Sequence, residues 1–200
     1  MTEGDLAIRW RDCFLEIIQE PSRAARLKDA AISEALMDWT AQLTASVVRS
    51  CAALGWCAAG KGHTSNRLPQ SRQEYLALDV MAFPGDVEAD LPARWPLPIA
   101  AVELENSVKD ERVAYSLWKV LCVKADLRVV FAYRPDWERA RQIVAMLEGE
   151  VVGSLTIAQR DTLGGQTVLV LGSRGEGETF PWGYFKFWEL DANLGRFIKI

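Results

Sequence analysis

Two carboxylates stand one residue apart at the end of an apolar stretch. The segment 98–107 reads PIAAVELENS, so Glu103 and Glu105 follow five apolar residues. Alternate residues of a strand share a face, and both acids therefore point to the same side of a predicted sheet. Burying them together is costly, because each carboxylate loses its hydration and repels the other. This arrangement predicts that a cation compensates the two charges.

A third acid belongs to the strand expected just before. The segment 74–83 reads as a strand in which Asp79 shares a face with Tyr75 and Ala77. If this strand pairs with the one at 99–105, Asp79 lies beside Glu103. Three carboxylates would then converge, and Mg²⁺ or Mn²⁺, which prefer hard oxygen ligands, would bridge them.

A lysine on the following helix is placed to join this cluster. The segment 110–123 predicts an amphipathic helix, and Lys119 lies off its apolar stripe. The long side chain of a lysine can reach over apolar surface towards the carboxylates at the edge of the sheet. The stripe itself consists of Val113, Leu117, Val120 and Leu121.

Helices and strands are expected in different parts of the chain. Hydrophobic periodicity predicts two helices, then three strands, then a helix that leads into a buried strand. A strand, helix and strand in this order normally form a parallel crossover. The expected helices span 5–19, 22–55 with Ser22 as its N-cap, 110–123 and 136–147, and the expected strands span 56–59, 74–83, 99–105, 127–133 and parts of 167–174, 182–190 and 194–200.

Composition limits the class of protein. Half of the 200 residues are hydrophobic, which predicts one well-filled core and a single domain over 1–200. The net charge of −4 argues against gripping nucleic acid through overall positive charge. Four cysteines without a CxxC pair and one histidine indicate neither disulfides nor structural zinc, so reduced thiols in a cytoplasmic protein are expected. The acidic start and the absence of a long apolar run predict neither export nor membrane insertion.

A polar segment at 61–73, KGHTSNRLPQSRQ, could contact phosphates. It carries Lys61, Arg67 and Arg72 without any acid. Its histidine, His63, could act as a base or a ligand, although a lone loop histidine usually does neither. The alternative interpretation of the whole segment is a solvated loop.

An aromatic segment near the C-terminus has two interpretations as well. Trp182, Tyr184, Lys186 and Trp188 alternate along one face of a predicted strand. Unpaired bases stack on such surfaces, and ordinary sheet packing explains the pattern equally well. The glycine-rich stretch 173–183 before it is expected to be a connection.

The order of elements and the acids resemble the PD-(D/E)XK nuclease superfamily, whose fold is that of restriction endonucleases. The resemblance covers about 5–133 and rests on Asp79 and the Glu103, Leu104, Glu105 triplet. It implies an α/β fold with a three-layer core, in which helices flank a mixed sheet, with further C-terminal strands.

The resemblance also assigns roles to individual residues. It implies that Asp79 and Glu103 bind Mg²⁺. Glu105 stands where the family usually has lysine; some members carry an acid or amide there, and others take the lysine from the next helix, here Lys119. Members often add an acid from the first helices, for which Glu16 and Glu34 are both candidates.

The function that the resemblance implies is metal-dependent hydrolysis of phosphodiester bonds in DNA. Glu105 would bind a second metal ion or orient the attacking water, and Lys119 would stabilise charge on the phosphate. Since many such enzymes act as dimers, a homodimer is one expected assembly. The alternative is a catalytically inactive accessory protein on the same fold, which binds a protein partner. The plainest interpretation leaves Glu103 and Glu105 at an exposed strand end, paired with Lys109 or Arg112.

Overall fold

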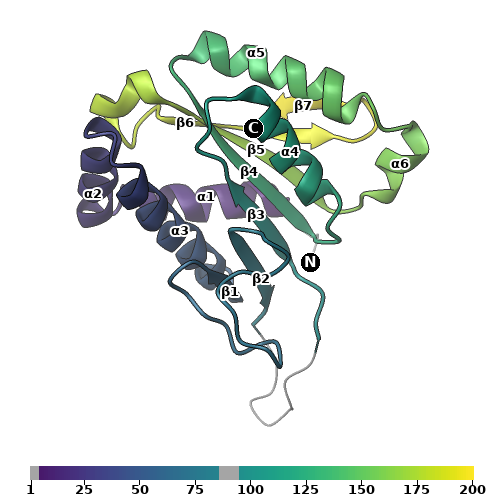
Figure 1. Ribbon diagram of the computed structural model, residues 1–200, viewed down its shortest axis with the longest axis horizontal. Coiled ribbons are helices and arrows are strands. Elements are labelled where there is room, and N and C mark those ends of the chain that lie inside the picture. The colour runs from purple at the N-terminus through teal and green to yellow at the C-terminus, as the bar shows by residue number, and fades with distance from the viewer. Residues whose placement is uncertain (1–4, 86–94) are drawn as a thin grey trace.

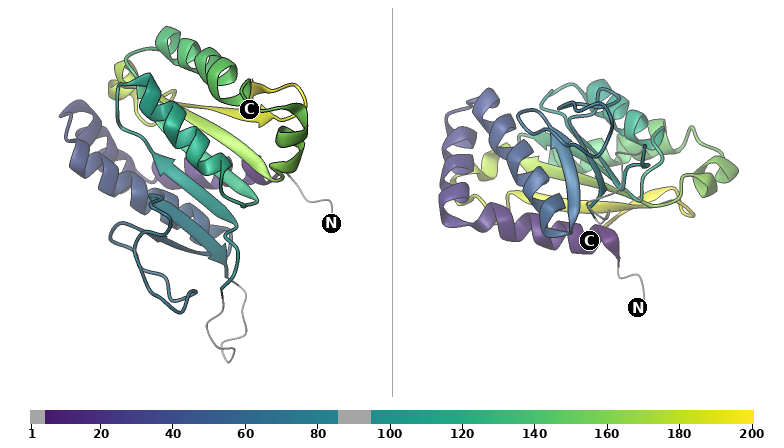
Figure 2. Two further views of the ribbon diagram at one scale, coloured as in Figure 1. Left: turned by 45° about the vertical axis from the view of Figure 1, so that its right-hand side comes forward. Right: turned by 90° about the horizontal axis from the view of Figure 1, so that it is seen from below.

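The computed structural model describes residues 5–85 and 95–200, and within them it forms one mixed seven-stranded sheet. Helices α1, α2 and α3 cover one face, and α4 and α5 cover the other (Figure 1). Figure 2 shows these three layers from two further sides. The fold is therefore α/β, as predicted.

The strands follow each other across the sheet in chain order. The first three pair antiparallel, the next two join them parallel, and the last two are antiparallel again. The parallel pairing of β3 with β4 confirms the predicted parallel connection through α4. The strands are β1 (Trp56–Gly60), β2 (Val80–Pro84), β3 (Ala100–Leu104), β4 (Leu127–Arg134), β5 (Gln166–Ser173), β6 (Phe185–Asp191) and β7 (Arg196–Lys199).

Most predicted helices are present with bounds close to those expected. The structure adds a short helix, a π-helical turn and a 3-10 helix that the sequence pattern did not predict. The helices are α1 (Leu6–Gln19), α2 (Pro21–Ile32), α3 (Leu36–Ala53), α4 (Asp110–Leu121), α5 (Trp137–Leu147), η1 (Glu148–Val152), α6 (Ile157–Thr162) and η2 (Arg174–Thr179). Within the described ranges, none is both long and apolar enough to cross a membrane.

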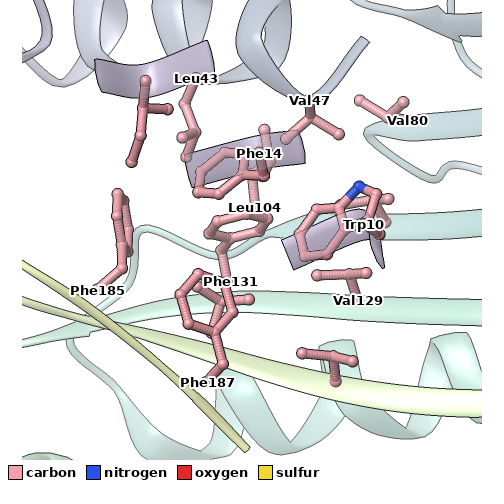
Figure 3. Packing of buried hydrophobic residues seen from close by; sticks show 14 of the residues in the cluster. Trp10, Phe14, Leu43, Val47, Val80, Leu104, Val129, Phe131, Phe185 and Phe187 are labelled. Carbon is pink, nitrogen blue, oxygen red and sulfur yellow. The ribbon is translucent and has the colours of Figure 1, made fainter. Parts of the chain in front are cut away.

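Aromatic rings fill the core between the sheet and the first three helices (Figure 3). The ring of Phe14 lies within 6.3 Å, centroid to centroid, of four others, those of Trp10, Phe131, Phe185 and Phe187. At the start of α1, the backbone amide of Ala7 donates to the side chain of Gln166, the first residue of β5. The N-terminal helix is thus fixed against a strand from the last quarter of the chain.

The long helix predicted over 22–55 is two helices. The chain breaks between α2 and α3, where Glu34 has a positive φ of 53°. Ser22 is not the N-cap, because α2 already begins at Pro21, and proline is well suited to the first helical position. The apolar periodicity continues across the break, which is why the pattern alone suggested one helix.

The strand predicted over 74–83 begins only at Val80. Leu76 and Ala77 have positive φ angles of 53° and 55°, and Tyr75 forms an isolated bridge with Leu78. These residues therefore make a tight turn, and the alternation that placed Tyr75 and Ala77 on the face of Asp79 does not apply. Asp79 itself directly precedes the strand.

The aromatic strand near the C-terminus is shorter than expected. β6 begins at Phe185, so Trp182 and Tyr184 lie outside it, and Tyr184 is buried. Phe185 and Phe187 pack into the core with the first helices, as sheet packing requires. A continuous base-stacking face from Trp182 to Trp188 is therefore not formed. Part of the preceding connection, Arg174–Thr179, is the 3-10 helix η2.

Candidate functional site

Asp79 and Glu103 meet where β2 begins and β3 ends. The register pairs Val80 with Val102, so the next position in each strand places Asp79 opposite Glu103. The Oδ2 of Asp79 accepts a hydrogen bond of 2.7 Å from the backbone amide of Leu104. The predicted proximity of these two acids is therefore present, and one oxygen of Asp79 also ties the two strands together.

Glu103 is buried, with 6% of its surface exposed, and its two oxygens differ in their partners. The Oε2 lies 2.7 Å from the ammonium nitrogen of Lys119. The Oε1 is buried and has no hydrogen-bond partner among the described residues. A buried carboxylate oxygen without a partner costs free energy, which makes it the site's clearest candidate to bind a ligand.

Lys119 is held in place from two directions. Its ammonium also donates a hydrogen bond of 2.8 Å to the carbonyl of Ala77, in the turn before Asp79. The start of its helix is anchored by Arg134, whose guanidinium lies 2.6 Å from the carboxylate of Asp110. The side chain of Lys119 thus reaches from α4 to the end of β3, as its position off the apolar stripe predicted.

Burial raises the pKa of both carboxyl groups. The pKa of Glu103 rises from 4.5 to about 7, first because of desolvation and further because of nearby Asp79, while Lys119 opposes the shift. The pKa of Asp79 is raised mainly by desolvation, and the Leu104 amide and Lys119 counteract it. One lysine therefore does not fully compensate the buried Glu103 and the half-buried Asp79.

Glu105 is anchored separately. One of its oxygens accepts a 2.7 Å hydrogen bond from the backbone amide of Ser107, and the other lies 3.4 Å from the hydroxyl of Ser116 on α4. Across residues 5–85 and 95–200, no group of three or more Asp, Glu, His or Cys side chains could hold a metal ion. The structure thus brings Asp79 and Glu103 together and places Glu105 beside them without a shared centre.

The acids considered on the first helices lie apart from this pair. Glu34 is exposed at the break between α2 and α3 and lines a small pocket with Trp39 and Arg174. Neither Glu34 nor Glu16 is among the charged groups that shift the pKa of Asp79 or Glu103. Helix α3 instead contributes Thr40, whose hydroxyl accepts a 2.8 Å hydrogen bond from the side chain of Asn106.

Two polar groups near the site were not predicted. The Oδ1 of Asn106 and the hydroxyl of Tyr133 are both buried without a partner in the described part of the chain. Asn106 follows β3 and Tyr133 is the next-to-last residue of β4, so both lie at the same end of the sheet as Glu103, but on the face that packs against the first helices. The sequence signal for Asn106 was the polar run ENS, 105–107, directly after the apolar strand. Only Glu105 of this run was predicted to have a role.

The basic loop contributes less free charge than its sequence suggests. The guanidinium of Arg67 donates to the sulfur of Cys57 and to the carbonyl of Gly85, so it braces the loop. The guanidinium of Arg72 lies 3.4 Å from the side-chain oxygen of Gln70, and His63 pairs with the backbone of Gly60. Lys61 and Arg72 are exposed and remain the candidates for phosphate contact.

An exposed aromatic pair flanks Lys119 on α4. Tyr115 and Trp118 are 55% and 52% exposed, and their ring centroids lie 5.9 Å apart. The apolar stripe of the helix fills the core without them. The spacing of these two residues in the sequence did not predict a role for them.

Comparison with known proteins adds no assignment: no protein family, curated protein or solved structure matches this chain. The fold is an α/β sheet with helices on both faces. The site consists of the buried Glu103 of β3, the half-buried Asp79 just before β2, and Lys119, which reaches both the carboxylate of Glu103 and the turn before Asp79.

Proposed function

We propose that this protein is a Mg²⁺-dependent phosphodiester hydrolase that acts on DNA. The observation that carries the proposal is the meeting of Asp79, Glu103 and Lys119 at the carboxyl end of β3. A nuclease needs oxygen ligands for a metal ion and a cation for the phosphate, and these three side chains supply both kinds of group.

The order of elements supports the same proposal. The elements from β2 to β4 come in a fixed order. Asp79 precedes the strand β2, Glu103 lies in β3, Lys119 lies on α4, and β4 then pairs parallel with β3. This is the order in the PD-(D/E)XK nucleases that the sequence resembles. Glu105 stands where these nucleases usually have a lysine, and Lys119 would supply the ammonium group from helix α4 instead.

The residues present fit a Mg²⁺ ion. Mg²⁺ is usually bound by one or two carboxylates, with waters and substrate phosphates completing its shell. Glu103 offers its unpaired Oε1, and Asp79 has a second oxygen besides the one that accepts from Leu104. When bound, the ion would polarise the phosphate and lower the pKa of a water molecule.

The chain's own groups would then orient the reaction. Lys119, already fixed by the Ala77 carbonyl, would stabilise negative charge that grows on the phosphate oxygens. Glu105, fixed by Ser107 and Ser116, would accept a hydrogen bond from the attacking water and so orient it. Tyr115 and Trp118 flank the lysine and would contact the substrate strand.

Cleavage assays with conservative variants test this proposal. Plasmid and single-stranded DNA are incubated with Mg²⁺ or Mn²⁺ and wild-type protein, Asp79→Asn, Glu103→Gln or Lys119→Met. We expect each substitution to lower the cleavage rate by about 10² or more, because each removes a group fixed for the transition state. Glu111→Gln, at an exposed position of α4, is the matched control and should cleave like wild type. Undiminished cleavage by both acid variants would remove the site assignment.

A catalytically inactive accessory protein is the second candidate function. The ion pair between Lys119 and Glu103 favours it, since a lysine can replace a metal ion as the compensating charge. The net charge of −4 also favours a protein partner over DNA. Thermal unfolding with increasing Mg²⁺ separates the two, because an ion that binds the folded state must raise the unfolding temperature. An unchanged temperature at millimolar Mg²⁺ would favour the accessory protein.

A further inference from the structure

A pocket lined by basic and aromatic side chains lies on the α5 side of the sheet, between that helix and the last two strands. It has a volume of about 160 Å³, well above the ~10–15 Å³ that a single water needs by the same measure. Five residues line it, of which three are basic and two are tryptophans: Trp137, Arg141, Lys186, Trp188 and Lys199.

Helix α5 lines one side of this pocket, and strands β6 and β7 line the other. Lys186 and Trp188 alternate on one face of β6, and the register places Lys199 of β7 opposite Trp188. Trp137 and Arg141 are one turn apart on α5, so they share one face of that helix. In Figure 1, α5 passes along the sheet above these strands. The five side chains therefore lie on rigid elements.

Positive charge in the pocket is poorly compensated. The ammonium of Lys186 lies 3.6 Å from the centre of the Trp137 ring, an arrangement that stabilises the cation. Burial, Lys199 and Arg141 nevertheless lower the pKa of Lys186, and only Glu176 acts in the opposite direction. Arg141 has a surface salt bridge with Glu138, and exposed pairs of this kind stabilise weakly. None of the lining residues in the described chain is acidic.

We propose that this pocket binds the phosphate group of a nucleotide. Lys186, Lys199 and Arg141 would surround the phosphate, and a bound anion would remove the repulsion between them. The face of Trp137 is already occupied by Lys186, which leaves the half-buried ring of Trp188 to stack with the base. This site shares no residue with the pair of acids, so its occupancy does not depend on nuclease activity.

Binding in the presence of EDTA tests the proposal without any cleavage. Calorimetry and tryptophan fluorescence are recorded with inorganic phosphate, thymidine, thymidine 5′-monophosphate and a 5′-phosphorylated oligothymidylate. The monophosphate should bind at least about tenfold more tightly than phosphate or thymidine, because it engages both the cations and the ring. Tighter binding of the oligonucleotide than of the monophosphate identifies the end of a strand as the source of the phosphate; equal binding identifies a free nucleotide.

Variants assign the binding to these residues. Lys186→Met with Lys199→Ala should weaken binding of the monophosphate about tenfold or more, and Trp188→Phe should reduce the fluorescence change. Lys199→Ala alone, at an exposed position of β7, should weaken it severalfold even if the double variant folds poorly. Arg196→Ala, on the same strand but the opposite face, is the control and should bind like wild type. The proposal is overturned if the monophosphate binds no better than inorganic phosphate, or if Lys199→Ala leaves its affinity unchanged.

Discussion

The carboxylate of Glu103 is buried, and only one of its oxygens is paired, with Lys119. Desolvation is the largest cause of its raised pKa of about 7, and the neighbouring Asp79 adds to it. At neutral pH this group therefore changes charge readily. Glu103 must lose its proton before it can bind a metal ion, because the ion binds the carboxylate form.

Folding stability should depend on the titration of Glu103. Between its ordinary pKa of 4.5 and about 7, the folded protein holds a proton that the unfolded chain has lost. The free energy of unfolding should therefore fall as pH rises through this range, by on the order of 2 kcal/mol from this group. Glu103→Gln should show a smaller fall in urea unfolding at pH 5 and pH 8. Equal slopes in wild type and variant would show that this carboxyl is not perturbed.

The site depends on a close approach between β1, α3 and the start of β2. A Cβ atom on Gly60, the last residue of β1, would lie 3.0 Å from the carbonyl oxygen of Asp79 and 3.1 Å from the methyl group of Thr44. Only a glycine lets the backbone before β2 pass here without a shift. The position of Asp79 is thus set by packing of backbone as well as by its bond to Leu104.

Gly60→Ala should test this packing. The added methyl group must displace the Asp79 backbone or α3, so we expect a loss of about 1–3 kcal/mol in the free energy of unfolding. The response of the unfolding temperature to Mg²⁺ should shrink as well. Gly149→Ala, where a Cβ meets nothing within 4 Å, is the control and should change neither quantity much. A Gly60→Ala protein with wild-type stability would contradict the close approach.

The elements that the sequence predicted well are those with a strong apolar period. β3, α4 and β4 were predicted within about two residues, and Lys119 was correctly placed off the apolar stripe of its helix. The turn at Leu76 and Ala77 and the break at Glu34 were missed, because their positive φ angles occur without the glycine or asparagine that signals them. The separate anchoring of Glu105 was also missed, since it depends on side-chain distances to Ser116 that spacing does not give.

Two apolar layers hold the sheet, one on each face. Phe14 is central to the first, because its ring meets one ring from its own helix and three from β4 and β6. These contacts join the N-terminal helix to strands that lie more than a hundred residues later. The site-bearing strands β2 and β3 share this layer through Val80 and Val102.

Phe14→Ala should destabilise the whole protein. Removing a fully buried ring leaves a cavity that its neighbours fill only in part, so we expect a loss of about 3–5 kcal/mol in urea unfolding. Ile198→Ala, on the half-exposed edge strand β7, should cost less than about 1 kcal/mol. A small effect at Phe14 would mean that α1 is not an integral part of the core.

Helix α1 is fixed by the side chain of Gln166, and its aromatic face packs on β4 and β6. During synthesis this helix is completed before the strands β4 and β6 that receive it. Helices α2 and α3 follow soon afterwards, but the rings of β6 that meet Phe14 come only roughly 170 residues after it. The aromatic face of α1 is therefore incompletely buried until β6 has been made, and exposed apolar surface of this kind favours aggregation.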